Sequence, residues 1–379
     1  MIYLDNSATT KPYKEVLTTV QTVADDYFAN PSSLHALGGR SEALMAEARR
    51  QAAALIGTLP QDVVFTSGGT ESNNLAIKGT AFAHRRRGKH MITTVIEHAS
   101  VLRAFEQLES LGFEVTYLTP HADGRITFDD FLKAYREDTL LVSVMHVNNE
   151  TGAVQPVLQI GEFLKQQPRT VFHVDHVQGF TKVPLRLADS GIDLCTISGH
   201  KIHGPKGTGL LYVRQGVLLS PLFAGGGQES GYRSGTENLP GICGLVKAMR
   251  LTKEREAAGV AHLKTLQQRL VAALPAIGGT VHTCSDNAAP HIVNVSFKGL
   301  RSEVLVHALE EKDIFVSTKS ACASKESEAS AVLLAMGVPE EEASAAIRIS
   351  MAYETTVEEI DRFLTILKES VASLTLAAR

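Results

Sequence analysis

The sequence has few cysteines and no long apolar run. Its four cysteines, Cys195, Cys243, Cys284 and Cys322, are far apart, form no Cys-X-X-Cys pair and have no histidine at zinc spacing. A disulfide framework or a metal site is therefore not expected, and each thiol has to be considered separately. No segment approaches the roughly 20 apolar residues that a membrane-spanning helix needs, so we expect no membrane association.

The start of the chain also lacks a secretory signal. Its first ten residues, MIYLDNSATT, contain neither a basic stretch nor an apolar segment, and we therefore expect cytoplasmic residence. The net charge is only −4, and the one compact basic run, His84 to Lys89, falls between a helical segment and a strand-like one. A solvated connector explains this run better than a nucleic-acid site does, so no direct nucleic-acid partner is expected.

Apolar, β-rich runs alternate along the chain with segments whose apolar residues recur at helical spacing. This alternation predicts an α/β protein with a mostly parallel sheet covered by helices on both faces. The predicted strands are 91–95, 114–118, 140–146, 171–174, 194–197 and 209–213, and the predicted helices are 41–55, 72–87, 99–111 and 128–135.

A chain of 379 residues exceeds the roughly 100–200 residues of a typical domain, which predicts two unequal domains. A continuous helical stretch at 241–273 is expected to connect them, and a smaller α/β pattern follows with strands at 292–297 and 347–351. We predict a large domain over 16–250. Residues 1–15 and 251–379 are predicted to form the small domain, which carries Cys322.

Two polar side chains follow predicted strands at their carboxyl ends. Asp175 ends one strand, and Lys201 follows the next strand 26 residues later. Ligands of open α/β sheets bind at this edge, where loops converge. Pyridoxal phosphate suits this pair, because it needs an amine for a Schiff base and a carboxylate that keeps its pyridine nitrogen protonated. Taken singly, a surface lysine and a strand-end cap are the better explanations of the two residues, and only their combination with the further motifs of the chain favours the cofactor.

A phosphate group needs donors, and the segment 66–71, Thr-Ser-Gly-Gly-Thr-Glu, leads from a strand end through a glycine turn into a helix. Backbone N–H groups at such a helix N-terminus bind anions, and Thr70 adds a hydroxyl. Helix capping alone explains the same residue types, so this turn is weak support by itself.

Cys322 has a different setting from the other cysteines. It lies in a small, polar, charged stretch at 317–328 that lacks helical or strand periodicity, and Lys319 and Lys325 flank it. We predict an accessible loop in which nearby positive charge favours the reactive thiolate. Cys195, within an apolar strand, is expected to be inert, and Cys243 and Cys284 are expected to be structural or incidental.

Many ordered motifs give the chain a resemblance that extends nearly end to end. It resembles the cysteine desulfurases of the aminotransferase class V group, within the fold-type I pyridoxal-phosphate enzymes, which implies a seven-stranded sheet in the large domain. The Ser-Ala-Cys setting of Cys322 resembles the long-loop group. The motifs are Tyr3 to Thr10, Asn30 to Ser33 with His35, Ser67 to Asn73, Glu97-His98, Asn148 to Gly152, His173 to Asp175, Ser198 to Lys201, Gly204 to Gly207, Arg233 to Thr236, and Ser320 to Cys322.

The resemblance implies a role for each matching residue. It makes Lys201 the amine that binds the cofactor, His98 the residue that stacks over its ring and moves protons, and Cys322 the residue that accepts sulfur. Arg348, with Asn149 as helper, would bind the substrate carboxylate. The remaining implied cofactor contacts are Asp175 to the ring nitrogen, Gln178 to the ring hydroxyl oxygen, Gly69, Thr70, Ser198 and His200 to the phosphate, and Thr236 from the neighbouring subunit of a homodimer.

The implied reaction converts L-cysteine to L-alanine and leaves a persulfide on Cys322. A sulfur-acceptor protein would then take the sulfur for iron–sulfur cluster assembly, tRNA thiolation or another sulfur-containing cofactor. The alternatives are another class V aminotransferase, a selenocysteine lyase, or a scaffold that docks sulfur-relay proteins. Helix capping by His98 and a strand-edge ion pair of Arg348 remain the structural interpretations of those residues. One departure is His176, because the residue after Asp175 is usually small in this family.

Overall fold

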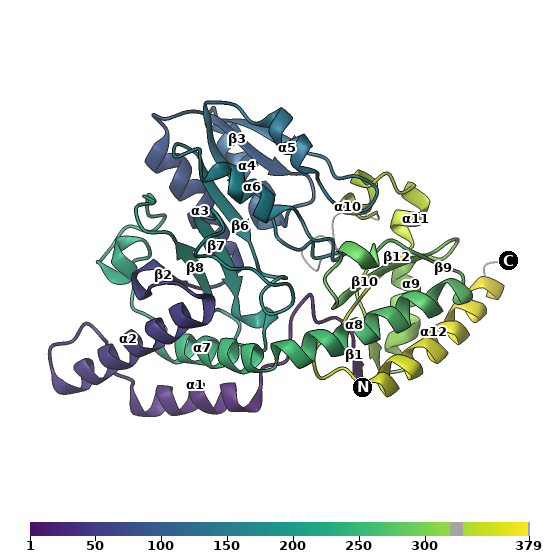
Figure 1. Cartoon of the computed structure of the whole chain (residues 1–379). Helices are drawn as coiled ribbons and strands as arrows, with labels where there is room; N and C mark the ends of the chain where they lie inside the picture. The colour runs from purple at the N-terminus through teal and green to yellow at the C-terminus, as the bar shows by residue number, and fades with distance from the viewer. Residues whose placement is uncertain (319–328, 378–379) are drawn as a thin grey trace.

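The computed structural model describes residues 1–318 and 329–377. Its larger lobe contains a seven-stranded sheet in the order β2-β8-β7-β6-β5-β3-β4 (Figure 1). Strand β8 is antiparallel to both of its neighbours, and every other pair is parallel, so the predicted mostly parallel sheet is confirmed. The strands are β2 (Val63–Thr66), β3 (His90–Thr94), β4 (Glu114–Leu118), β5 (Thr139–Ser143), β6 (Val171–Asp175), β7 (Leu194–Ser198) and β8 (Gly209–Val213).

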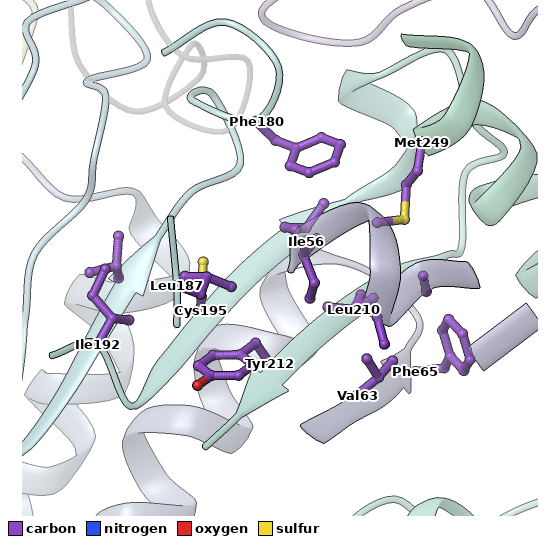
Figure 2. Packing of buried hydrophobic residues seen from close by; sticks show 14 of the residues in the cluster. Ile56, Val63, Phe65, Phe180, Leu187, Ile192, Cys195, Leu210, Tyr212 and Met249 are labelled. Atoms are coloured by element: carbon purple, nitrogen blue, oxygen red, sulfur yellow. The ribbon is translucent and has the colours of Figure 1, made fainter. Parts of the chain in front are cut away.

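Helices cover both faces of this sheet because successive side chains of each strand point to opposite sides. Along β8, Leu210 and Tyr212 join the cluster on one face, whereas Leu211 and Val213 join the cluster on the other. Figure 2 shows the first face, where Tyr212 and Leu210 lie near Ile56. One face packs against α3 (Gly69–His84) and α4 (Ala99–Ser110), and the other against α2 (Ala36–Ile56), α5 (Phe128–Ala134), α6 (Val157–Leu164) and α7 (Leu239–Glu254), with α1 (Lys14–Asp26) beside α7.

The smaller lobe has an antiparallel sheet, β12-β10-β9, and a separate parallel pair, β1-β11. Ile2 and Leu4 are buried in its core together with apolar residues between 263 and 367, so the N-terminal strand crosses to this lobe. The division at residues 15/16 and 250/251 stays a prediction. The elements are β1 (Ile2–Tyr3), α8 (Glu256–Ala273), β9 (Gly279–Val281), β10 (Ile292–Phe297), α9 (Ser302–Glu310), β11 (Ile314–Phe315), α10 (Ala331–Ala335), α11 (Glu340–Ser344), β12 (Ala346–Ser350) and α12 (Val357–Ala377).

The long connecting helix predicted over 241–273 was wrong in one respect, because it is interrupted at Arg255. This residue, at φ −94° and ψ −3°, is the C-cap of α7 and the N-cap of α8 and so separates the two helices. The break lets α7 pack against the large lobe while Leu263 and Leu266 of α8 enter the core of the small lobe. Gly259 brings α8 close to Tyr353, where a Cβ would lie 2.4 Å from the ring.

Other differences concern the ends of elements. The strand predicted over 140–146 is shorter and ends at Ser143. The N–H groups of Val144 and His146 still donate to the carbonyls of His173 and Asp175, whereas the Met145 N–H donates to the Glu97 Oε1. The basic run predicted as a solvated connector is confirmed for the arginines at 85–87 and Lys89, which are exposed between α3 and β3. The prediction was wrong for His84, which is buried at the end of α3. Across residues 1–318 and 329–377, none of the helices has the length and apolar character to cross a membrane.

Candidate active site

A cavity of about 170 Å³ lies at the carboxyl ends of β6 and β7, beside the N-terminus of α3. Segments far apart in sequence meet there, including the N-terminal Ser7 and Ala8 and, from the small lobe, Arg348. Most of the residues that the sequence singled out line this one cavity. They are Gly69, Thr70, His98, Asn149, Asp175, Gln178, Ser198, His200, Lys201 and Arg348.

The predicted acid and amine come from neighbouring strands. Asp175 is the last residue of β6, and Lys201 ends the 3-10 turn that follows β7. The Lys201 Nζ donates to the backbone carbonyls of Ser7, at 2.5 Å, and Ala8, at 2.8 Å. The N-terminal segment therefore lies directly against the amine.

The carboxylate of Asp175 is held at both oxygens. Its Oδ1 accepts from the backbone N–H of Val177 at 3.0 Å, and its Oδ2 accepts from the Asn73 amide at 2.7 Å. Since the side chain is largely buried, these two contacts fix the plane of the carboxylate at the cavity wall.

An anion site adjoins this pair. Helix α3 begins at Gly69, directly after Gly68 in the positive-φ region at +150°, and the first N–H groups of a helix bind anions. A Cβ at Gly69 would lie 3.2 Å from Val177 Cγ2 and 3.6 Å from Ser198 Cβ, so the approach is close. The Ser198 Oγ is buried without a hydrogen-bond partner among the described residues.

His200 completes this corner of the cavity. Its Nδ1 lies 3.2 Å from the Thr9 Oγ1. Burial, together with the positive charges of Lys201 and Lys206, lowers the pKa of His200 to about 4. The ring is therefore neutral near pH 7.

These residues fit pyridoxal phosphate. Lys201 supplies an amine, Asp175 a carboxylate for the ring nitrogen, and the N-terminus of α3 a site for the phosphate. The unpartnered hydroxyl of Ser198 is a donor suited to a phosphate oxygen.

His98 lines the cavity and also caps a helix. Its Nδ1 accepts from the backbone N–H of Ser100 at 3.2 Å, at the N-terminus of α4. Burial lowers the pKa of His98, the charge of Asp175 raises it, and Lys201 lowers it further, with a net shift downward. The capping role and the cavity position are thus compatible.

Arg348 extends from β12 into the cavity with 1% of its surface exposed. Its Nη1 donates to the backbone carbonyl of Asn149 at 2.9 Å, and its Nη2 donates to Asp5 at 2.9 Å and to Ser317 at 2.8 Å. The Nε is buried without a partner in the described part of the chain. The guanidinium is therefore oriented by protein contacts and retains an unsatisfied N–H donor.

Two of the singled-out residues, Thr236 and His176, lie elsewhere. Thr236 lines a separate cavity with Arg233 and Glu237, so a single chain does not bring it to Lys201. Cys322 lies outside the described residues. His176 does not line the Lys201 cavity; its Nδ1 lies 2.9 Å from the Nδ1 of the buried His146.

The other cysteines differ in their surroundings. Cys195 is fully buried in β7, and burial, followed by the charge of Asp175, raises the pKa of its thiol. Burial raises the pKa of Cys243 to about 11. Cys284 is half-buried. The thiols of Cys195 and Cys243 are thus poor nucleophiles at neutral pH, as expected from their apolar settings.

Sequence reasoning assigned no role to several residues of the cavity wall. Ser7 and Asn73 belong to motifs that carry the family resemblance, yet nothing in their spacing indicates that they contact Lys201 and Asp175. Ser100 carried only the signal of a small polar residue near a helix start. The residues without a predicted role are Ser7, Ala8, Asn73, Ser100, Met145, Val147 and Val177.

Comparison with known proteins identifies the family of the chain. A profile of the aminotransferase class-V family matches residues 2–363. The chain is 46% identical over 376 residues to a NifS/IcsS protein homolog of Lactobacillus delbrueckii subsp. bulgaricus, with 97% of each chain covered. It is 44% identical over 375 residues to the cysteine desulfurase IscS of Methanosarcina thermophila, covering 98% of this chain and 92% of that relative.

Solved structures give the same result. A NifS-like protein matches with a TM-score of 0.93 and 37% identity, covering 98% of this chain and 100% of the other. A structure of SspA in complex with cysteine matches with a TM-score of 0.82 and 37% identity, covering 94% and 100%. The chain therefore belongs to the aminotransferase class-V family. Within it, the chain falls in the group of the cysteine desulfurases.

Proposed function

We propose that this chain is a pyridoxal-phosphate-dependent cysteine desulfurase that converts L-cysteine to L-alanine and accepts the sulfur on Cys322. The observation that carries the proposal is that the amine of Lys201, the carboxylate of Asp175 and the guanidinium of Arg348 line one cavity. An amino-acid substrate needs a group for its carboxylate as well as a cofactor for its amine. The relatives named as cysteine desulfurases and the cysteine complex of SspA support cysteine as that substrate.

Pyridoxal phosphate, when bound, supplies an electron sink that weakens bonds at the substrate's α- and β-carbons. Asp175 would keep the proton on its ring nitrogen, and Ser198, His200 and the N-terminus of α3 would hold its phosphate. Arg348 would bind the substrate carboxylate through its free N–H, as charge-assisted pairs of this kind orient ligands. The Lys201 Nζ would carry a proton to and from the substrate carbon.

The sulfur step uses Cys322. Its thiolate attacks the sulfur of L-cysteine, and the Cβ–S bond breaks as the new S–S bond forms. The electron pair left on the substrate carbon takes up a proton, so L-alanine leaves and a persulfide remains on Cys322. A thiol of the acceptor then attacks the outer sulfur of this persulfide and carries it away.

The assembly and the destination of the sulfur are further parts of the proposal. We propose a cytoplasmic homodimer in which Thr236 of one subunit completes the phosphate site of the other, since one chain holds Thr236 in a separate cavity. The acceptor would be a protein of iron–sulfur cluster assembly or tRNA thiolation.

The test is to incubate the cofactor-loaded protein with L-cysteine and to measure alanine and protein-bound persulfide. We expect Cys322→Ala to lose persulfide formation and at least about a hundredfold of the alanine rate, since a nucleophile is removed. Cys284→Ala is the matched control and should behave as the unchanged protein. A Cys322→Ala protein that still forms alanine and sulfide at the full rate would contradict the proposal.

A selenocysteine lyase is the alternative closest in chemistry. The same assay with L-selenocysteine separates the two, because a lyase would release selenide at a rate independent of Cys322. Another class V aminotransferase would instead transfer the amino group of an amino acid to an oxo acid without forming alanine from cysteine.

A further inference from the structure

Four polar side chains form a continuous hydrogen-bonded chain along the wall of the Lys201 cavity. The Asn73 Nδ2 lies 2.7 Å from the Asp175 Oδ2 and 2.9 Å from the Ser100 Oγ. The Ser100 Oγ in turn lies 2.8 Å from the His98 Nδ1. Asn73 and Ser100 are largely buried, and Asp175 and His98 are the two ends of the chain.

The charge of Asp175 sets the direction of every bond in this chain. A carboxylate accepts hydrogen bonds, so the amide of Asn73 must turn its nitrogen, rather than its oxygen, toward Asp175. The second hydrogen of that nitrogen then points to the Ser100 Oγ, which accepts it. The single hydroxyl hydrogen of Ser100 is left to donate to the Nδ1 of His98.

The backbone reaches the same nitrogen independently. The N–H of Ser100 points to the His98 Nδ1 at 3.2 Å, as part of the cap of α4. Two donors facing Nδ1 leave no place for a hydrogen on it, so the ring hydrogen must lie on Nε2. His98 lines the cavity, and no hydrogen-bond partner for its Nε2 occurs in the part of the chain that the structure describes.

We propose that Asn73 and Ser100 are positioning residues that hold His98 as the neutral Nε2–H tautomer, so that it presents a fixed hydrogen-bond donor to the ligand in the cavity. The tautomer follows from the geometry alone, and its effect on catalysis rests on the proposed function. In this tautomer Nε2 cannot act as a base. A second proton, on Nδ1, would face the N–H of Ser100 and disrupt the hydrogen bonds that link His98 to Ser100.

Because the series of hydrogen bonds ends on Asp175, it also couples two residues that line the cavity, Asp175 and His98. Loss of the Asn73 amide would release one oxygen of Asp175 and allow the Ser100 hydroxyl to rotate. His98 would then be held by the backbone N–H alone. Removing the buried amide of Asn73 should therefore alter the tautomer of His98, although Asn73 does not contact His98.

The experiment uses the full-length protein labelled with 15N-histidine, with and without bound cofactor, in long-range 1H–15N spectra near neutral pH. His98→Gln assigns the signal of His98. We expect the unchanged protein to show Nε2–H alone, and Asn73→Ala and Ser100→Ala to show mixed tautomers. Ser100→Thr keeps a hydroxyl and should restore the single tautomer. Asn74→Ala is the matched control, because its amide donates to the backbone carbonyls of Thr70 and Ser100.

Steady-state kinetics with L-cysteine provide the second measurement. Because each variant loses one neutral hydrogen bond, we expect kcat of Asn73→Ala and Ser100→Ala to fall roughly three- to tenfold. KM should change by less than about twofold. His98 found as Nδ1–H or as imidazolium in the unchanged protein would overturn the inference. So would Asn73→Ala and Ser100→Ala proteins that keep the original tautomer. If the tautomer responds as expected but no variant acts on cysteine, the proposed function fails and the positioning role stands.

Discussion

Arg348 and Asp5 form an ion pair, with 2.9 Å between Nη2 and Oδ1, that joins β12 to the N-terminal segment. The side chain of Arg348 is 1% exposed, whereas that of Asp5 is 21% exposed, so the cation is the more deeply buried partner. Leaving such a cation unpaired would be costly, which explains why Asp5, Ser317 and Asn149 all accept from it. The N-terminal segment thus orients Arg348 as well as lying against Lys201.

Arg348→Lys should weaken cysteine binding much more than cofactor binding. Lysine keeps the charge but cannot reproduce the planar set of donors that Arg348 uses, and losing one hydrogen bond to a charged carboxylate costs about 1.5–3 kcal/mol. The measurement compares KM for L-cysteine with the dissociation constant of pyridoxal phosphate. Arg269→Lys, which changes an exposed pair with Asp361, is the matched control. Equal losses of cysteine and cofactor affinity would remove the proposed role of Arg348.

Lys201→Ala should abolish the visible absorption that a lysine-bound pyridoxal phosphate gives. The Nζ of Lys201 is the amine that lines the cavity with Asp175, and alanine offers no nitrogen for the cofactor aldehyde. The absorption spectrum of the protein after reconstitution with pyridoxal phosphate is the measurement. The exposed Lys206 serves as control, and Lys206→Ala should keep the band. A band of full intensity in Lys201→Ala would assign the amine to another residue.

The positions of Asp175 and Lys201 could be predicted because strand periodicity and strand ends are local signals. Parallel neighbours in a sheet carry their ends to one edge, so two such residues meet without knowledge of the packing. The contacts of Asn73 and Ser100 could not be predicted in this way. They depend on how α3 packs against α4, and a small polar residue near a helix start is explained by capping alone.

The break at Arg255 was missed for a related reason. Helical propensity continues through this residue, and the interruption reflects the separate cores against which α7 and α8 pack. Arg348 shows the opposite limit: the ion pair expected of it is present, and its role in binding the substrate carboxylate stays a prediction. It forms an ion pair with Asp5 and also lines the cavity, and sequence spacing alone could not show that one side chain does both.

The unusual His176 is accommodated by a glycine three residues later. A Cβ at Gly179 would lie 2.4 Å from the Nδ1 of His176 and 2.8 Å from the Nδ1 of His146. Gly179→Ala should therefore destabilise the fold by about 1–3 kcal/mol through overpacking. A shortened side chain should relieve the clash, so the double variant Gly179→Ala with His176→Ala should lose less stability than the sum of the two single changes.

The measurement for this pair is a double-mutant cycle of urea unfolding. Gly39→Ala is the control, because a Cβ at Gly39 of α2 meets nothing within 4 Å. It should stabilise the helix by about 0.5–1 kcal/mol. Additive effects of the Gly179 and His176 changes would contradict the steric coupling.

Glu97 should make the stability of the fold depend on pH. Burial, with the negative charge of Asp175 adding to it, raises the pKa of Glu97 to about 8, although the Met145 N–H and the Thr94 hydroxyl lower it. In the unfolded chain this carboxyl titrates near 4.3. Between about pH 4.5 and about pH 8, Glu97 is therefore protonated in the native state and ionised in the unfolded chain. The free energy of unfolding falls as pH rises through this window, by at most about 1.4 kcal/mol per pH unit.

Glu97→Gln removes this titration while keeping a carbonyl oxygen for the Met145 N–H and the Thr94 hydroxyl. Its free energy of unfolding, relative to the unchanged protein, should rise from about pH 5 to about pH 8. Urea unfolding at both pH values measures the difference. Glu162→Gln, on the exposed end of an ion pair with Lys165, should show no such trend. If the free energies of unfolding of Glu97→Gln and the unchanged protein differed by the same amount at both pH values, Glu97 would be ionised in the native state. Its buried Oε2, which has no hydrogen-bond partner among the described residues, would then carry negative charge.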